Sequence, residues 1–272
     1  MKKFGIYFFC ALFLSTSLTS CGGGDEDGSN SGNNNNGNNS GSSRRIVSIV
    51  KKTVASNYRE TITYYYHYDS QGRISVISSN RSDGTNKIRE YSYNPTMITE
   101  RVNSQYPVGN DSYVNTYELS NGRIVKEKRV TGSGGSGTSW THHYKTNKYT
   151  YDSNGYMISS SQKDHDTNIE TNIVYTWENG NLMKEARSNS QGSSEEKYTY
   201  SNISWERGFF TDYSLGTCDK FLMSMGYYGN LPKKLPISTG YETYEYSLSG
   251  RDIGTVTFKE GGYVTTLTYT WE

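Results

Sequence analysis

Apolar and polar residues alternate along most of residues 44–272, in short runs separated by turn-forming Gly, Asn and Asp. A period of two is typical of β-strands with one buried face. Thr, Tyr, Val, Ile and Ser dominate the runs, and helical periodicity is nearly absent. The pattern therefore predicts an all-β domain.

A motif repeats through this domain: Tyr, any residue, a second aromatic residue, a turn that usually contains Gly, and an aliphatic residue. Its copies begin at Tyr66, Tyr91, Tyr117, Tyr149, Tyr175, Tyr198, Tyr244 and Tyr269. Because residues i and i+2 of a strand share a face, each copy places two side chains on one side before the chain reverses. One copy thus corresponds to one β-hairpin.

The spacing of the copies indicates a regular antiparallel meander. Most neighbouring copies lie 23 to 32 residues apart, and the 46 residues between Tyr198 and Tyr244 predict a degenerate copy near residues 221–223. We expect roughly fourteen to sixteen strands in an up-and-down, barrel-like arrangement. Because about eight strands already enclose as much space as side chains can fill, such a barrel must be flattened, partly open or occupied by a ligand.

Two features refine this picture. Asn121-Gly122 and Asn179-Gly180 are dipeptides that accept positive φ at both central positions of a hairpin turn. The segment 209–235 lacks the alternation and predicts a short helix or an ordered loop. The strand faces opposite the tyrosines carry Thr, Lys, Glu and His, which predicts a soluble domain and not a lipid-facing barrel.

The first twenty residues have the features of an export signal: Lys2 and Lys3, an apolar run over 4–14, and Leu18-Thr19-Ser20 before Cys21. The run is shorter than the roughly 20 apolar residues that span a bilayer. The order and spacing resemble a lipoprotein signal peptide, which implies cleavage before Cys21, lipidation of Cys21 and a membrane anchor made of lipid.

Residues 21–43 then read as a disordered tether, because Gly, Ser and Asn predominate after Cys21 and no aliphatic or aromatic side chain is present. Its acidic stretch Asp25-Glu26-Asp27 resembles the signal that sends Bacteroidetes lipoproteins to the cell surface, although a solvated charge cluster explains it equally well. We therefore expect an outer-membrane lipoprotein, on either the periplasmic or the surface side.

Charge and cysteine content exclude several classes. The chain has 28 basic and 27 acidic residues, and loss of Lys2 and Lys3 leaves 26 against 27, so nothing favours nucleic acid as a partner. Cys10 leaves with the signal and Cys21 is lipidated, so Cys218 has no partner for an internal disulfide.

No catalytic or cofactor motif is recognisable. His67, His142, His143 and His165 are spaced as solvated strand and loop residues, and adjacent strand residues such as His142 and His143 point to opposite faces, so no metal site or cofactor is expected. Acidic neighbours such as Glu195-Glu196 diverge for the same reason and predict no glycosidase pair. The aromatic residues outside the motif, Trp140, Trp205, Tyr227 and Tyr228, are the candidates for a ligand-contact surface.

The copies at Tyr66, Tyr117 and Tyr149 resemble the tyrosine-aspartate repeats of Rhs shells. Over residues 44–272 the chain is more similar to an uncharacterised family of Bacteroidetes lipoproteins with a porin-like fold, which share the lipobox, the tether, the Tyr-rich hairpins and a segment like 226–236. The resemblance implies a barrel-like meander and carries no activity.

The interpretation that these observations favour is a non-enzymatic envelope lipoprotein whose single β-domain, 44–272, binds or scaffolds a glycan, a peptide or an envelope protein. One alternative is a carrier of lipid or another hydrophobic ligand, because an unfilled barrel offers an apolar cavity. A second alternative is an enzyme that acts on polysaccharide.

Overall fold

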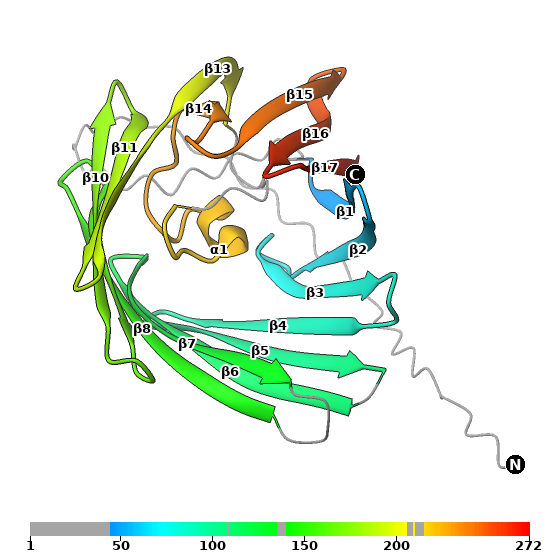
Figure 1. The fold of residues 1–272 in the computed structure, drawn as a ribbon, viewed down its shortest axis with the longest axis horizontal. Helices are drawn as coiled ribbons and strands as arrows, with labels where there is room; N and C mark the ends of the chain where they lie inside the picture. Colours follow the sequence, from blue (N-terminus) through cyan, green and yellow to red (C-terminus); the bar gives the residue numbers. More distant parts are fainter. Residues whose placement is uncertain (1–43, 108, 135–139, 206–208, 210–214) are drawn as a thin grey trace, which may run out of the picture. The chain divides into compact units, whose positions relative to one another are not determined.

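Seventeen β-strands follow one another around a ring, and a short helix lies within it (Figure 1). This computed structural model describes residues 44–107, 109–134, 140–205, 209 and 215–272, without the side chains of 131–134, 140 and 141. Arg44–Glu272 form one unit. Within these ranges, no helix is long and apolar enough to cross a membrane.

The elements in chain order are β1 (Ile46–Ala55), β2 (Tyr58–Tyr68), β3 (Ile74–Arg81), β4 (Asn86–Asn94), β5 (Met97–Tyr106), β6 (Gly109–Ser120), β7 (Arg123–Gly134), β8 (Trp140–Tyr151), β9 (Met157–Asp164), β10 (Glu170–Glu178), β11 (Asn181–Asn189), β12 (Gly192–Lys197), β13 (Thr199–Ser204), α1 (Lys220–Ser224), β14 (Lys234–Ser238), β15 (Thr243–Ser249), β16 (Asp252–Glu260) and β17 (Tyr263–Trp271).

The ring is a nearly closed barrel with one unsealed seam. Each strand pairs with the next in antiparallel ladders from β1 to β12 and from β13 to β17, and β17 pairs with β1. Among the described residues, β12 and β13 are the one neighbouring pair without a ladder. These two strands follow one another on either side of Tyr198, so a bend in one long segment produces both. This bend also raises the strand count to 17, slightly above the sequence-based expectation. The all-β meander and the barrel-like shape are confirmed.

The motif maps onto the barrel in two layers. All eight first tyrosines of the motif are buried among the aliphatic residues that begin the return strands.

The turn prediction is confirmed, because φ is 50° at Asn121 and 74° at Gly122, and 51° at Asn179 and 82° at Gly180. The repeat turns lie at one end of the barrel, which we call the repeat rim. The opposite end, the distal rim, is formed by the connections β1–β2, β3–β4, β5–β6, β7–β8, β9–β10, β11–β12, β14–β15 and β16–β17.

The second aromatic residue of most copies ties two strands together at the repeat rim. Its hydroxyl or indole N–H donates to a backbone carbonyl of a neighbouring strand over 2.5 to 2.9 Å, in the pairs Tyr68–Ile46, Tyr93–Ile74, Tyr151–Ile124, Trp177–Met157, Tyr200–Leu182, Tyr246–Pro236 and Trp271–Ile253. We call these the rim hydrogen bonds. In the copy that begins at Tyr117, Leu119 holds the position and has no polar group to donate.

A β-bulge accompanies most repeat turns. In five hairpins the register shifts by one residue just after the return strand begins, which leaves an extra residue at Ser75, Val125, Ile158, Met183 or Gly254. The bulge places the third residue after the aliphatic one on the inner face, as at Ile77, Glu127 and Glu185. Bulges also increase local twist, which helps the sheet close.

Residues 215–232, which belong to the segment predicted as a helix or ordered loop, lie inside the barrel (Figure 1). We call residues 215–232 the plug; it contains α1, whose residues Phe221 to Ser224 are all buried, and Asp219 caps the helix by accepting from the backbone N–H groups of Phe221 and Leu222. The predicted degenerate hairpin near 221–223 is therefore wrong. Consecutive apolar residues are buried on every side here, whereas a wall strand alternates.

Candidate functional site

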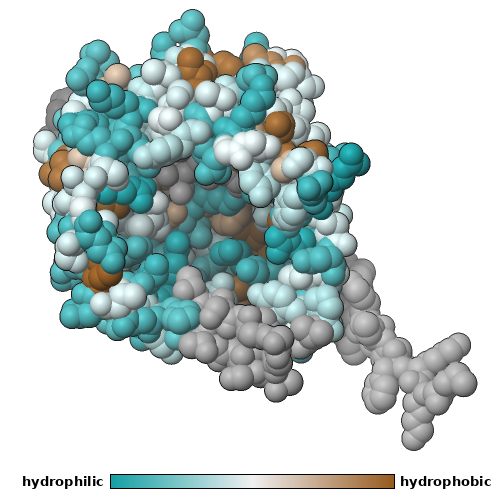
Figure 2. Space-filling view, in the orientation of Figure 1, coloured by the Kyte–Doolittle hydropathy of each residue, from teal (hydrophilic) through white to brown (hydrophobic). Residues whose placement is uncertain are grey.

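A cavity lies near the distal rim, between α1 and the inner faces of β2, β3 and β4. Its volume is about 230 Å³, and it is lined by Ile62, Tyr64, Ile77, Ser79, Arg81, Thr85, Lys87, Arg89, Tyr106, Lys220 and Phe221. The space-filling view shows that the barrel is hollowed on the face seen in Figure 2, with mostly hydrophilic side chains inside the hollow. The lining combines aromatic rings with four basic residues and contains no carboxylate.

The basic residues reach the cavity from three elements. Arg81 ends β3 and pairs with Glu60 and Asp83, while Lys87 and Arg89 point inward from β4. Lys220 comes from α1, with its Nζ 5.9 Å from the ring centre of Tyr64 and 5.3 Å from that of Phe221. Burial, followed by the charge of Arg89, lowers the pKa of Lys87 below its usual value.

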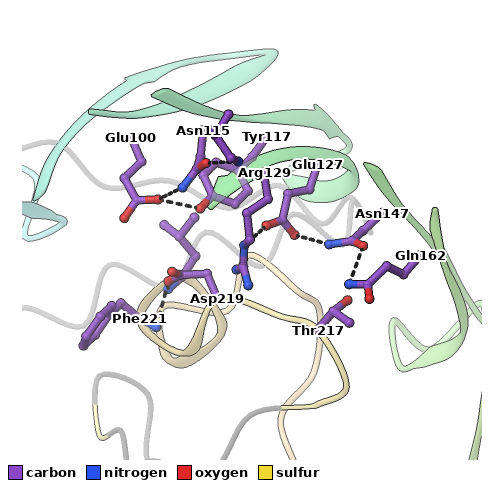
Figure 3. A network of polar contacts seen from close by, with 12 residues as sticks. Glu100, Asn115, Tyr117, Glu127, Arg129, Asn147, Gln162, Thr217, Asp219 and Phe221 are labelled. Carbon is purple, nitrogen blue, oxygen red and sulfur yellow. Dashed lines mark hydrogen bonds and ion pairs between the residues drawn. The ribbon is translucent and has the colours of Figure 1, made fainter. Parts of the chain in front are cut away.

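A buried polar network lies beside this cavity, around Glu100 (Figure 3). The Glu100 carboxylate is fully buried and accepts from Arg89 at 2.6 Å, Tyr91 at 3.0 Å, Asn115 at 2.7 Å and Tyr117 at 2.9 Å. Tyr91 is its direct partner across the β4–β5 ladder. These four donors satisfy the carboxylate and hold it rigidly in the wall.

A buried glutamate beside an arginine recurs twice around the inner wall, and in these two cases both residues lie on the same strand. In β7, Glu127 Oε1 lies 2.7 Å from Arg129 Nε, and in β11, Glu185 Oε1 lies 2.5 Å from an Arg187 Nη atom. In β5 the position equivalent to the arginine is Val102, and Arg89 supplies the charge from the register position directly opposite. Each of these three buried glutamates therefore has an arginine beside it.

The plug is tied to these clusters. Tyr228 donates to Glu127 at 3.1 Å, and Asp219 Oδ2 lies 3.8 Å from the Arg89 guanidinium. Burial and the charge of Glu100 raise the pKa of Asp219. Burial raises the pKa of Glu100, but the charge of Arg89 and the hydrogen bond from Asn115 lower it by more. The pKa of Glu100 therefore lies below its usual value.

The pKa of Asp219 is raised and that of Glu100 is lowered, which is the pattern of a catalytic acid and base. Their contacts nevertheless indicate that both carboxylates stabilise the fold. Glu100 is fully buried with four donors, and Asp219 uses Oδ1 as the helix cap of α1. The cavity contains no carboxylate, and two further cavities contain one each, Asp111 and Asp252. None of these three cavities presents the pair that glycoside hydrolysis needs.

The predicted contact residues are not placed together. Trp205 is buried and donates from its indole to the Phe209 carbonyl at 3.0 Å, Tyr228 is buried against Glu127, and Tyr227 stacks on Tyr93 with ring centres 5.8 Å apart. The side chain of Trp140 lies outside the described residues. Ligand contact by these four residues stays a prediction, and the burial of Trp205 and Tyr228 favours a core role for both.

The histidines and cysteines give no centre for metal chemistry in the described part of the chain. His142 contacts Asp111 at 2.8 Å and His143 contacts Asp166 at 2.5 Å, as separate pairs. No group of three or more His, Cys, Asp or Glu side chains is placed to hold a metal ion within those ranges. Cys218 is buried in the plug, and burial raises its thiol pKa. Cys21 lies outside the described residues.

Sequence reasoning anticipated a cavity in an unfilled barrel but identified neither its polar lining residues nor the buried ion pairs. Glu-x-Arg occurs twice, at 127–129 and 185–187, and each time the Glu is the third residue after the buried aliphatic residue of the motif. This spacing is a usable signal once the repeated bulge is known, because the bulge turns that position inward. Without the bulge, strict alternation places the same Glu on the solvent face.

Comparison with known proteins gives the fold a precedent. No family model matches the chain, and no curated protein does. A porin-like protein from Bacteroides uniformis is similar over 84% of this chain and 98% of its own, with a TM-score of 0.59 and 17% identity. The fold is shared with porin-like proteins. A second one, from Bacteroides vulgatus, covers the same shares with a TM-score of 0.52 and 13% identity. At these identities the likeness to porin-like proteins concerns the fold alone.

Proposed function

We propose that the chain is a cell-envelope lipoprotein, anchored through Cys21, whose barrel domain is a non-enzymatic module that binds a small ligand in the cavity beside α1. The observation that carries this proposal is the cavity itself. It is a concave space with aromatic and cationic groups converging from the wall and the plug.

A binding role fits the barrel better than a pore. The plug occupies the lumen with buried apolar residues and is tied to the wall by Tyr228 and Asp219. The outward face also carries exposed charged residues along the strands, among them Lys52, Glu90 and Arg101, whereas a lipid-facing barrel needs a continuous apolar band.

The lining discriminates between classes of ligand. Four basic residues and several hydroxyl groups surround the space, which disfavours an acyl chain because burying unpaired polar groups against hydrocarbon costs free energy. The volume of about 230 Å³ is below the roughly 300–1,000 Å³ typical of sites for drug-sized ligands. Both features favour a polar ligand, or part of one, about the size of a single ring.

The test is a titration of residues 21–272 carrying Cys21→Ser with glucose, galactose, N-acetylglucosamine, glucuronate and galacturonate, followed by amide NMR. We expect shifts that saturate and centre on β2–β4 and α1. Ser79→Trp fills the cavity from β3 and should abolish binding, whereas Ser78→Trp on the other face of that strand should not. Absence of binding by every probe, or binding that survives Ser79→Trp, would contradict the proposal.

A further inference from the structure

We propose that the cavity beside α1, taken as the binding site proposed above, selects a ring-sized organic anion, and that the Lys87 ammonium is the counter-ion of its acidic group. The proposal depends on how Lys87 is placed relative to the three wall arginines that pair with buried carboxylates and to the other basic residues that line the cavity.

Lys87 departs from the pattern of the three inward-facing arginines beside buried carboxylates. Arg89 is paired with Glu100, Arg129 with Glu127 and Arg187 with Glu185. Among the described residues, no carboxylate forms an ion pair or hydrogen bond with Lys87. A partly buried cation without a carboxylate costs stability, so its retention here is best explained by an anion that arrives from outside.

The neighbours of Lys87 on both sides are serines. Its register partner on β3 is Ser79, and its partner on β5 is Ser104. The Ser104 hydroxyl is buried and has no hydrogen-bond partner among the described residues. Lys87 and Ser79 both line the cavity and provide a cation and a hydroxyl donor side by side, which suits an oxyanion, whereas Ser104 supports Lys87 from the other side and lines a different cavity.

The opposite wall completes the site. Lys220 projects from α1 into the same cavity, where Arg81 and Arg89 also contribute lining atoms. Three of these cations have assigned contacts: Arg81 with Glu60 and Asp83, Arg89 with Glu100 and Asp219, and Lys220 with the rings of Tyr64 and Phe221. They raise the potential in the cavity, while Lys87 is the group left to pair with the ligand.

The aromatic lining sets the body of the ligand. Tyr64, Tyr106 and Phe221 line the cavity together with the aliphatic Ile62 and Ile77. An acidic group at Lys87 thus leaves the remainder of the ligand against rings and methyl groups, which fits a sugar acid or an aromatic acid and excludes a fully hydrated inorganic ion as the preferred occupant.

The experiment compares glucose with glucuronate, two rings that differ in one carboxylate, by calorimetry on residues 21–272 with Cys21→Ser. We expect glucuronate to bind at least about tenfold more tightly than glucose, equivalent to about 1.4 kcal/mol. Lys87→Met should remove that preference and Lys87→Arg should retain most of it. Lys52→Met, at an exposed outward position of β1, is the matched control and should leave the preference intact.

Benzoate and inorganic sulfate extend the comparison. Tighter binding of benzoate than of glucuronate would identify an aromatic acid as the ligand class, and the reverse order would identify a sugar acid. Either order supports the proposal. Sulfate binding as tight as either ring acid would overturn it, as would equal affinity for glucose and glucuronate or a glucuronate affinity unchanged in Lys87→Met. Equal affinity for glucose and glucuronate contradicts the anion preference but not the proposed binding module. Absence of binding by every probe contradicts both proposals. Circular dichroism of each variant confirms its fold.

Discussion

The hydroxyl of Tyr151 donates a hydrogen bond of 2.6 Å to the backbone carbonyl of Ile124. The two residues lie at the repeat rim, where β7 and β8 have no connecting turn and their ladder has already ended at Lys126 and Lys148. The Arg123 guanidinium lies 5.7 Å from the centre of the same ring. Arg123, Ile124 and Tyr151 thus act together to join two strand ends that lack ladder hydrogen bonds. Arg73, Ile74 and Tyr93 repeat this arrangement between β3 and β4.

Replacement of Tyr151 by Phe removes the rim hydrogen bond and retains the ring. We expect the free energy of unfolding to fall by about 1 kcal/mol, the usual net worth of one such bond, measured by urea denaturation. Tyr65→Phe, on the exposed face of β2, should change it by less than about 0.5 kcal/mol. An equal effect of the two substitutions would show that the rim hydrogen bonds do not stabilise the barrel.

Glu127→Gln tests the buried ion pairs. The change leaves Arg129 without its carboxylate in the wall, and removal of one partner of a buried pair typically costs about 3–5 kcal/mol. Glu118→Gln, which breaks the exposed pair with Lys126, should cost less than about 1 kcal/mol. Urea denaturation of both variants checks the contrast, and similar losses would mean that the Glu127 cluster is not desolvated.

Gly229 tests the contact between the plug and the wall. Its φ is +84°, and a Cβ there would lie 2.3 Å from the Gly155 carbonyl oxygen and 3.1 Å from the Tyr151 ring. Gly250 has a φ of +67°, and a Cβ there would have nothing within 4 Å, so Gly250→Ala carries only the backbone cost of a left-handed conformation, roughly 1–2 kcal/mol. Gly229→Ala should lower the midpoint of thermal unfolding further than Gly250→Ala. Equal shifts would place Gly229 away from the wall.

Lys87→Met should stabilise the ligand-free protein at pH 7, because it removes a poorly solvated charge. The pKa of Lys87 is lower in the folded than in the unfolded chain, so the unfolded chain binds more protons and stability rises as pH increases through the lowered pKa towards 10.5. The advantage of the variant should therefore shrink over that pH interval. A destabilised variant at pH 7, by urea denaturation, would assign Lys87 a structural role.

The sequence predicted the parts of the fold that depend on short-range pattern. Tyr-x-aromatic pairs and the Asn121-Gly122 and Asn179-Gly180 turns specify hairpins locally, because side-chain alternation and positive φ are properties of a few neighbouring residues. The barrel-like meander followed from counting these hairpins, whereas the bend between β12 and β13 raised the strand number to 17, above the roughly fourteen to sixteen expected.

The contents of the barrel depend on contacts that no local pattern encodes. Residues 221–223 follow a sequence interval that suits another hairpin, yet Asp219 caps a helix and the run is buried on all sides. Lys87 looks like any strand lysine until the register places it between Ser79 and Ser104. Burial of Trp205 and Tyr228 likewise follows from the plug, which long-range packing positions.

The most direct test of the account is the reactivity of Cys218, the single cysteine of residues 21–272 once Cys21→Ser is introduced. Its side chain lies in the plug, 4% exposed, inside the barrel. We predict that a maleimide reagent labels the native protein at least about a hundredfold more slowly than the urea-unfolded chain, because the thiol reacts only when the plug opens. Labelling of the native protein as fast as of the unfolded chain would show that residues 215–232 do not fill the lumen.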